Sequence, residues 1–326
     1  MRRFFHRSSS RLEEGILRRS IRGVALAWLL ILGWGATLAV GAPANYPFLT
    51  WQDEFNGASI DASRWTFDLG TGSQYGLTGW GNNELQYYTD RTQNASVSGG
   101  LLRITARKES FGGMAYTSAR LKTQGLFAQA GGRFEMRAAL PTGQGIWPAF
   151  WMLPAGDAYG TWAASGEIDI LEARGQQPDR VTGALHYGGS WPANTYTSGT
   201  YVMPAGQTIS GFHTYAVEWD TAVNPAIRWY VDDVLYATQT SWWSSGGAYP
   251  APFDKPFYML LNLAVGGDFV GDPNVTTPFP AEMQVDYVRA FSAVPEPSTV
   301  WLAVCGVAWA GWQSTRRAKK AWACRG

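Results

Sequence analysis

Three acidic residues stand close together in an otherwise apolar stretch, Ser165-Gly166-Glu167-Ile168-Asp169-Ile170-Leu171-Glu172-Ala173. If this stretch is a regular strand, Glu167 and Asp169 share one face, and Leu171 rather than Glu172 returns to it. A β-bulge between Asp169 and Glu172 would restore Glu172 to that face, and bulges are common beside active sites. We therefore predict a bulged strand that presents three carboxyls on one side.

Carboxyls arranged in this way can hydrolyse glycosidic bonds. Hydrolysis with retention needs a nucleophile and an acid about 5–5.5 Å apart, and crowding of like charges raises the pKa of at least one of them. We assign Glu167 as nucleophile, Glu172 as acid and then base, and Asp169 as the group that orients the nucleophile. The pattern alone also fits a calcium-binding or merely solvated acidic edge.

The elements that must position these acids are short strands. The chain has 38 Gly and 17 Pro with few charged residues, a composition typical of strands joined by tight turns and not of long helices. Apolar side chains alternate in 101–106, 132–137 and 226–231, which is the strand period, and Asp232-Asp233 then predicts a hairpin turn. We expect an all-β fold, a two-sheet antiparallel β-sandwich of jelly-roll type with a concave substrate cleft.

The two ends of the chain differ from its middle. Basic residues, the apolar run Val24–Val40 and the small residues after it predict a signal peptide in 1–44; a membrane anchor is the alternative. Residues 45–293 contain no linker or repeat and are expected to form one domain. Both cysteines, Cys305 and Cys324, lie in the tail 294–326, so the domain contains no disulfide.

The charge of the middle excludes one class of partner. Between Val24 and Ala293 there are 14 Lys and Arg against 22 Asp and Glu, a net charge of −8. Nucleic acids are bound through concentrated basic charge. We therefore expect no nucleic-acid partner.

Several long motifs, in order, resemble glycoside hydrolase family 16 in its laminarinase-like form, over about Tyr46 to Ser292. They are 51–57 (WQDEFNG), 79–88 (GWGNNELQYY), 145–153 (GIWPAFWML), 166–172 (GEIDILE) and 261–267 (LNLAVGG). The resemblance implies an endo-acting, retaining β-1,3-glucanase with a glycosyl-enzyme intermediate and a β-glucan partner. The alternatives are a mixed β-1,3/1,4-glucanase, an agar-type galactan hydrolase, or a non-catalytic glucan-binding protein.

The tail also carries a resemblance. A Pro295-Glu296-Pro297 sequence precedes a short apolar run and a basic terminus, an order similar to the PEP-CTERM sorting tail of Gram-negative bacteria. The resemblance implies transient contact with the membrane and sorting machinery, tail processing, and an extracellular or cell-surface location. A tail with chance hydrophobicity is the alternative. We expect the exported domain to be a monomer.

Sugar rings stack on aromatic faces while their hydroxyls pair with a few polar groups. Trp147 and Trp151 share a face by their even spacing, and the resemblance places Trp147 in the donor subsites. It also implies substrate contacts for Asn83, Arg120 and Asn262 and a supporting role for His186, with Trp162 and Trp191 as candidates from loops. For these residues a place in the core, a turn or a surface ion pair is the structural alternative.

No cofactor is expected for catalysis, but the resemblance implies a structural calcium ion. Asp286 matches its side-chain ligand, and Glu54 and the Gly100 carbonyl are possible partners; oxygen ligands suit Ca²⁺. Acids at a strand edge without a metal are the alternative. The loop 268–271 (DFVG) departs from the family pattern of a Trp-Pro pair, so its contacts are not predicted.

Overall fold

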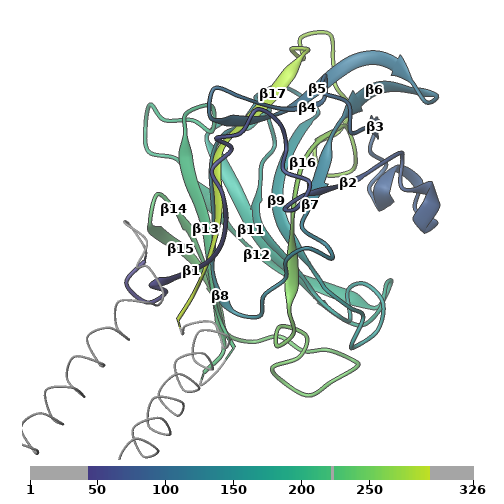
Figure 1. Cartoon of the computed structure of the whole chain (residues 1–326). Helices are drawn as coiled ribbons and strands as arrows, with labels where there is room; N and C mark the ends of the chain where they lie inside the picture. The colour runs from purple at the N-terminus through teal and green to yellow at the C-terminus, as the bar shows by residue number, and fades with distance from the viewer. Residues whose placement is uncertain (1–42, 222–223, 294–326) are drawn as a thin grey trace, which may run out of the picture.

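The computed structural model describes residues 43–221 and 224–293, which form two β-sheets stacked face to face (Figure 1). Residues 1–42 of the predicted signal peptide and the whole sorting tail, with Cys305 and Cys324, lie outside these residues. Two short 3₁₀ helices are the helices of the described chain, η1 (Ser73–Tyr75) and η2 (Thr78–Gly81). Neither they nor any other described segment forms a helix that is long and apolar enough to cross a membrane.

The larger sheet has ten strands, in the order β15-β14-β13-β8-β17-β5-β6-β3, with β1 beside β17 and β4 beside β5. All its pairings are antiparallel except β3 with β6. Its strands are β1 (Phe48–Asp53), β3 (Gln86–Tyr88), β4 (Ala95–Ser98), β5 (Leu101–Phe111), β6 (Met114–Ser118), β8 (Gly132–Ala139), β13 (His213–Asp220), β14 (Ala226–Val231), β15 (Val234–Gln239) and β17 (Ala281–Ser292).

The smaller sheet has seven antiparallel strands in the order β12-β11-β10-β9-β16-β7-β2. The acid-bearing strand β10 is therefore third from one edge, with four strands beyond it on the other side. The strands are β2 (Thr66–Asp68), β7 (Arg120–Lys122), β9 (Ile146–Pro154), β10 (Glu167–Glu172), β11 (Arg180–Gly188), β12 (Asn194–Val202) and β16 (Phe257–Val265).

The three alternating segments all form strands, in β5, β8 and β14. The predicted hairpin is also confirmed, because Val231 pairs with Val234 across Asp232 and Asp233. Both turn residues have positive φ, 49° and 61°, as a two-residue turn needs in order to match the twist of its strands. Apolar side chains from both sheets fill the space between them as one continuous core. The predicted all-β sandwich is thus confirmed.

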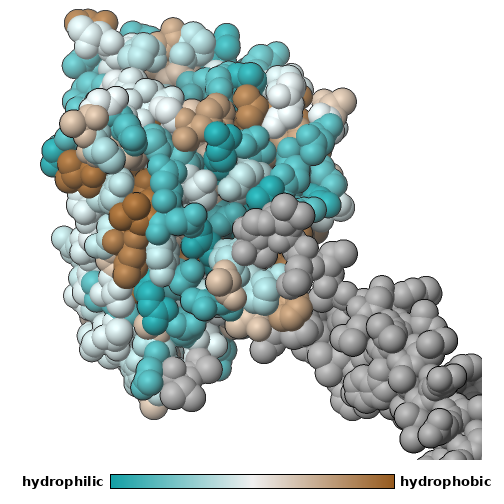
Figure 2. All heavy atoms as spheres, turned by 90° about the vertical axis from the view of Figure 1, so that its left-hand side faces the viewer, coloured by the Kyte–Doolittle hydropathy of each residue, from teal (hydrophilic) through white to brown (hydrophobic). Residues whose placement is uncertain are grey.

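The outer side of the larger sheet is mostly hydrophilic. Figure 2 views the molecule from the left of Figure 1 and shows teal and white residues with a few separate brown patches. Charged residues of β8 and β13 are buried here in ion pairs: Arg133 contacts Glu135 at 2.9 Å and Glu218 at 3.3 Å. Charges satisfied in this way are structural.

Gly183 of β11 packs against Trp229, a core residue that is hydrogen-bonded to β10. A methyl group there would lie 2.3 Å from Cδ1 of Trp229, and the indole N–H of Trp229 donates to the carbonyl of Asp169 at 2.8 Å. We predict that Gly183→Ala destabilises the fold by about 1–3 kcal/mol through overpacking and lowers activity by displacing the acid strand. Urea unfolding measures the first effect. Gly156→Ala, where the added methyl has nothing within 4 Å, is the control, and equal unfolding midpoints for the two variants would refute this account.

Candidate active site

The bulge predicted in β10 is present. Between Asp169 and Glu172, β10 advances three residues while β11 advances two, from Ala184 to Thr182. Ile170 and Leu171 both point into the core, where they are 2% and 0% exposed. The extra residue is therefore absorbed on the core side.

The register shows that the three acids share one face. Glu167 pairs with His186, Asp169 with Ala184 and Glu172 with Thr182. These partners alternate along β11, so they lie on one side of the sheet, and directly opposed residues in a sheet point the same way. Glu167, Asp169 and Glu172 thus form one row on the outer face of the seven-stranded sheet.

The pairing of neighbouring strands shows which other residues lie on the same face of the sheet as the acids. On one side of β10, Glu172 pairs with Ala149 of β9, Ala149 with Asn262 of β16, and Asn262 with Arg120 of β7. On the other side, Glu167 pairs with His186 of β11 and His186 with Tyr196 of β12. The acids therefore stand within a row of polar and aromatic groups and not at its end.

Glu172 has the properties of a proton donor. Burial, followed by the negative charge of Glu167, raises its pKa to about 7, against the lowering effects of a hydrogen bond from Trp147 and the charge of Arg174. The Trp147 indole N–H donates to Oε1 of Glu172 at 3.1 Å. Near neutral pH the carboxyl is thus poised to give and to take a proton.

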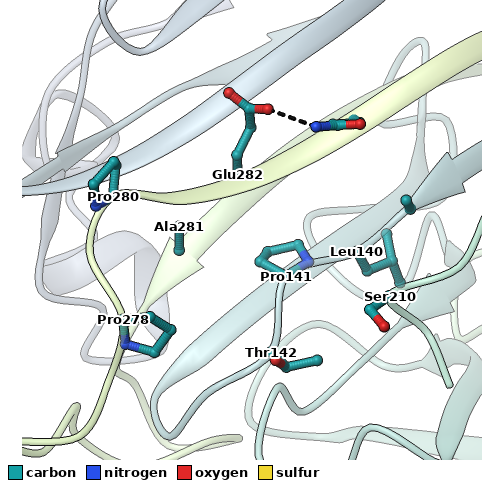
Figure 3. Close-up of a pocket in the computed structure, with 10 residues that line it drawn as sticks. Leu140, Pro141, Thr142, Ser210, Pro278, Pro280, Ala281 and Glu282 are labelled. Carbon is teal, nitrogen blue, oxygen red and sulfur yellow. Dashed lines mark hydrogen bonds between the residues drawn. The ribbon is translucent and has the colours of Figure 1, made fainter.

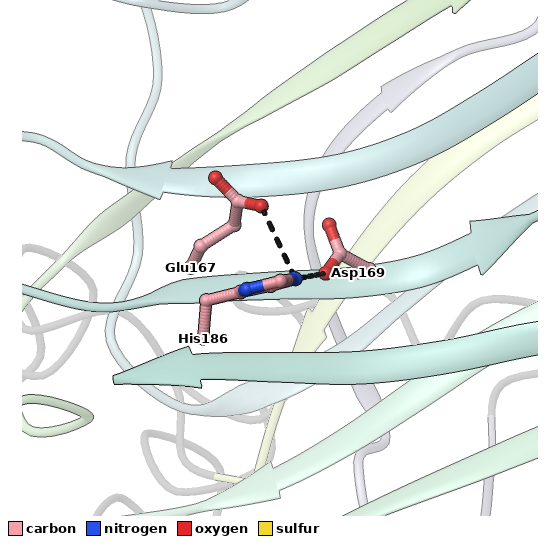
Figure 4. A group of neighbouring side chains, drawn as sticks. All are labelled: Glu167, Asp169 and His186. Atoms are coloured by element: carbon pink, nitrogen blue, oxygen red, sulfur yellow. Dashed lines mark ion pairs between the residues drawn. The ribbon is translucent and has the colours of Figure 1, made fainter. Parts of the chain in front are cut away.

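Asp169 lies deepest of the three. Burial and the charges of Glu167 and Glu172 raise its pKa well above the ordinary value, and a hydrogen bond with Glu167 adds to the shift. Figure 4 shows Nε2 of His186 directed at both carboxyls, 3.4 Å from Oδ2 of Asp169 and 3.9 Å from Oε1 of Glu167. In its protonated form, Asp169 can donate a hydrogen bond to Glu167.

The Trp162 indole N–H donates to Oε2 of Glu167 at 2.8 Å. The loop residue Trp162 thus contacts the nucleophile directly. Trp191 contacts Trp162 through its backbone, because the Trp191 N–H donates to the Trp162 carbonyl at 2.8 Å, and its own ring is 71% exposed.

On the β9 side of the acids, the predicted binding residues contact one another through a hydrogen bond and ring contacts. The Trp151 indole N–H donates to Oδ1 of Asn262 at 2.7 Å, and the Arg120 guanidinium lies over the Trp151 ring at 4.6 Å and over the Trp80 ring at 4.7 Å. Arg120 also pairs with Asp68 at 3.0 Å. Asn262 therefore positions the Trp151 side chain.

A buried polar network beneath these residues was missed by the sequence reasoning. The Glu84 carboxylate accepts hydrogen bonds from Gln86 at 2.7 Å and Tyr88 at 3.1 Å, and Tyr88 in turn accepts one from Asn262 at 3.2 Å. Burial raises the pKa of Glu84. An acid inside the aromatic segment 79–88 was the available signal, but its partners come from distant strands.

The loop 268–271, whose contacts were not predicted, packs against Trp147. Phe269 packs against the Trp147 ring with centroids 5.0 Å apart, and the Arg174 guanidinium lies 3.8 Å from the centroid of Phe269. Asn83 is exposed, and its amide donates to both oxygens of Asp268, at 3.0 and 3.1 Å. Asn83 therefore secures this loop, whichever sugar contacts it makes.

The residues expected to bind calcium lie on or beside the larger sheet, and both acids among them are paired with arginine. Asp286 is ion-paired with Arg137 at 2.6 Å, and both oxygens of Glu54 accept from Arg289, at 2.7 and 2.9 Å. Gly100 lies in the turn between β4 and β5. Within the described residues, the three acidic or His side chains close enough to share an ion are Glu167, Asp169 and His186, which belong to the catalytic row.

A surface hollow elsewhere on the molecule is not a second candidate for the active site. Figure 3 shows it between the start of β17 and residues 139–142. Its acidic residue, Glu282, accepts from Arg103 and from Gln284, the latter at 2.8 Å. The hollow therefore holds no free acid or base.

Three carboxyls in one row on the outer face of a β-sandwich, one of them with a pKa raised to about 7, form an arrangement that can hydrolyse glycosidic bonds. Residues 82–289 match the model of glycosyl hydrolases family 16, and the chain belongs to that family. The predicted resemblance is thus confirmed.

The chain is 43% identical to Glucan endo-1,3-beta-glucosidase A1 of Niallia circulans, over 78% of its own length and 40% of that relative. It is also 43% identical to Beta-glucanase of Rhodothermus marinus, over 74% of its length and 84% of the relative. Among solved structures, endo-beta-1,3-glucanase from Pyrococcus furiosus matches with TM-score 0.67 and 40% identity, over 76% of this chain and 95% of the other. The laminarinase from Rhodothermus marinus matches with TM-score 0.66 and 42% identity, over 75% and 96%.

The pKa of Glu172 gives a testable pH dependence. Because Glu172 must be protonated to act as the donor, kcat/KM should fall on the alkaline side as the pH rises through about 7. Trp147 stabilises the carboxylate form, so Trp147→Phe should raise the pKa and move the alkaline limb upward by about half a unit to one unit. Trp151→Phe, which removes an indole bonded to Asn262, should lower activity without moving that limb. A Trp147→Phe profile with its limb unmoved or lowered would contradict the assignment.

Proposed function

We propose that this chain is an endo-acting, retaining hydrolase of β-1,3-linked glucan of the laminarin type. The observation that carries the proposal is the bulged row of three carboxyls, in which a buried proton donor stands beside a hydrogen-bonded nucleophile. The family and the names of the relatives supply the glucan class.

The reaction takes two steps. Glu167 attacks the anomeric carbon and forms a bond to it, while the bond to the leaving oxygen breaks and that oxygen takes the proton of Glu172. In the second step water attacks the same carbon, gives its proton to Glu172 and releases Glu167. Asp169 keeps the nucleophile oriented throughout, as a neutral acid that donates a hydrogen bond to it.

The place of β10 within its sheet supports cleavage inside a chain. Four strands lie on one side of β10 and two on the other, and binding groups occur on both sides, from Arg120 to Tyr196. A polysaccharide lying across the strands would therefore extend past the acids in both directions. This arrangement favours endo cleavage over removal of terminal sugars.

The chemistry assigned to these carboxyls needs no cofactor. A structural calcium ion at Asp286, Glu54 and Gly100 stays a prediction, and the arginine ion pairs of the two acids do not favour it. No step of the mechanism depends on a metal.

The proposal includes export. The signal-peptide pattern of 1–44 and the Pro-Glu-Pro tail of 294–326 support delivery of the domain to the cell exterior or surface, with transient contact to sorting machinery, as a monomer. This location suits an enzyme whose polymeric substrate lies outside the cell.

The substrate assignment predicts which polymer is cut. Laminarin should release reducing ends, and oligosaccharides of intermediate length should form early. Lichenan and agarose, run in parallel, test the mixed-linkage and galactan alternatives. Glu167→Ala is the control for contaminating activity: it should abolish turnover but still bind laminari-oligosaccharides, because the stacking and hydrogen-bonding groups remain. If no β-1,3-linked glucan yields reducing ends, the proposal fails.

The acid role of Glu172 makes a separate prediction. Glu172→Ala should lose about 10²–10⁴-fold in the rate of glycosyl-enzyme formation on laminari-oligosaccharides, the usual contribution of a general acid. The loss should be much smaller on an aryl β-laminaribioside with an acidic phenol, since that leaving group departs without a proton. Pre-steady-state release of the phenol measures the step on the aryl glycoside, and the release of reducing ends under kcat/KM conditions measures it on laminari-oligosaccharides. A loss of equal size on both substrates would speak against the assignment.

A further inference from the structure

Tyr196 of β12 continues the catalytic row beyond His186. The two residues are paired in the sheet, and their rings are stacked with centroids 5.6 Å apart and an angle of 26° between the planes. The Tyr196 side chain is 64% exposed. A large aromatic face is therefore presented on the same side of the sheet as the acids.

The ring of Tyr196 is the outer end of an aromatic path that begins at the nucleophile. Trp162, which is bonded to Glu167, lies 5.6 Å from His186 between ring centroids, and His186 is stacked on Tyr196. Trp243 borders the path, since its ring lies 3.0 Å from the position of a side chain on Gly188. The rings lead from the reacting centre to the edge of the sheet.

Toward the Arg180 end of β11, the side chains next to Tyr196 are small and uncharged. Along β11 and β12, Ala184 and Ser198 are paired on this face next to the ring, followed by the pair Thr182 and Thr200. A flat aromatic surface flanked by small side chains and hydroxyls fits the C–H face of a neutral sugar ring. The ligand chemistry is therefore an uncharged pyranose.

The two sides of β10 differ in how firmly they can hold a sugar. On the β9 side, Arg120 and Asn262 are buried and fixed by further hydrogen bonds and ring contacts. On the β11 side the groups are exposed rings. In a two-step reaction one half of the substrate stays on the enzyme through both steps, whereas the other must leave and be replaced. Fixed hydrogen bonds suit the half that stays, and open stacking suits the half that exchanges.

We propose that Tyr196 binds the departing portion of the glucan and any sugar that replaces it, and so determines how the glycosyl-enzyme is divided between water and a sugar acceptor. This inference rests on the proposed function. In transfer to a sugar, an acceptor hydroxyl oxygen bonds to the anomeric carbon, the bond to Glu167 breaks, and the hydroxyl proton passes to Glu172. The step is balanced as the hydrolytic one is, with the sugar in place of water.

The test uses the full chain, an aryl β-laminaribioside as donor and laminaribiose as acceptor, with phenol release and transfer product measured together. Tyr196→Thr keeps a residue that favours strands but removes the ring. It should lower the ratio of transfer product to hydrolysis product on the order of fivefold. Tyr196→Phe, which keeps the ring, should stay within about twofold of wild type.

Val202→Thr is the matched control, because Val202 is exposed on the same strand and pairs with Arg180, far along β11 from His186. Its ratio should equal that of wild type, and equal unfolding midpoints show that all three variants are folded. An unchanged ratio in Tyr196→Thr overturns the inference. A wild-type protein that releases no phenol would instead refute the proposed function.

Discussion

The bulge in β10 is the constraint on which the rest of the site depends. A regular strand would bury one of the acids or expose an apolar residue in its place, because side chains alternate strictly between the two faces. Ile170 and Leu171 both face the core, and this places Glu172 on the side of Glu167 and Asp169. The Trp229 indole, bonded to the Asp169 carbonyl, holds the strand at the point where it departs from regular geometry.

The three carboxyls lie close enough to shift one another's pKa values. Like charges that are partly buried cannot all be ionised, so the protons are distributed unequally. The pKa of Asp169, the most buried of the three, is raised well above its ordinary value, and that of Glu172 is raised to about 7. One strand thus supplies two carboxyls of raised pKa beside Glu167. Trp147 and Trp162 each donate to one of the two outer carboxyls.

The two sides of this row are built differently. On one side, a buried network from Glu84 through Tyr88 to Asn262 fixes the groups that face the substrate. On the other, exposed rings extend to the sheet edge at Tyr196. A fully satisfied polar network is rigid, whereas exposed stacking surfaces allow exchange. The asymmetry matches a reaction in which one half of the substrate stays and the other leaves.

Local sequence determined the strands, the hairpin at Asp232 and Asp233, the sandwich class and the three acids, because strand alternation, turn conformation and charges in an apolar run are properties of neighbouring residues. The need for a bulge also followed from spacing. The tertiary structure decided what depends on strand order and register: the Glu84 network, the place of Tyr196 opposite His186, and the arginine partners of Asp286 and Glu54. Such contacts join residues far apart in the chain, and no local pattern specifies them.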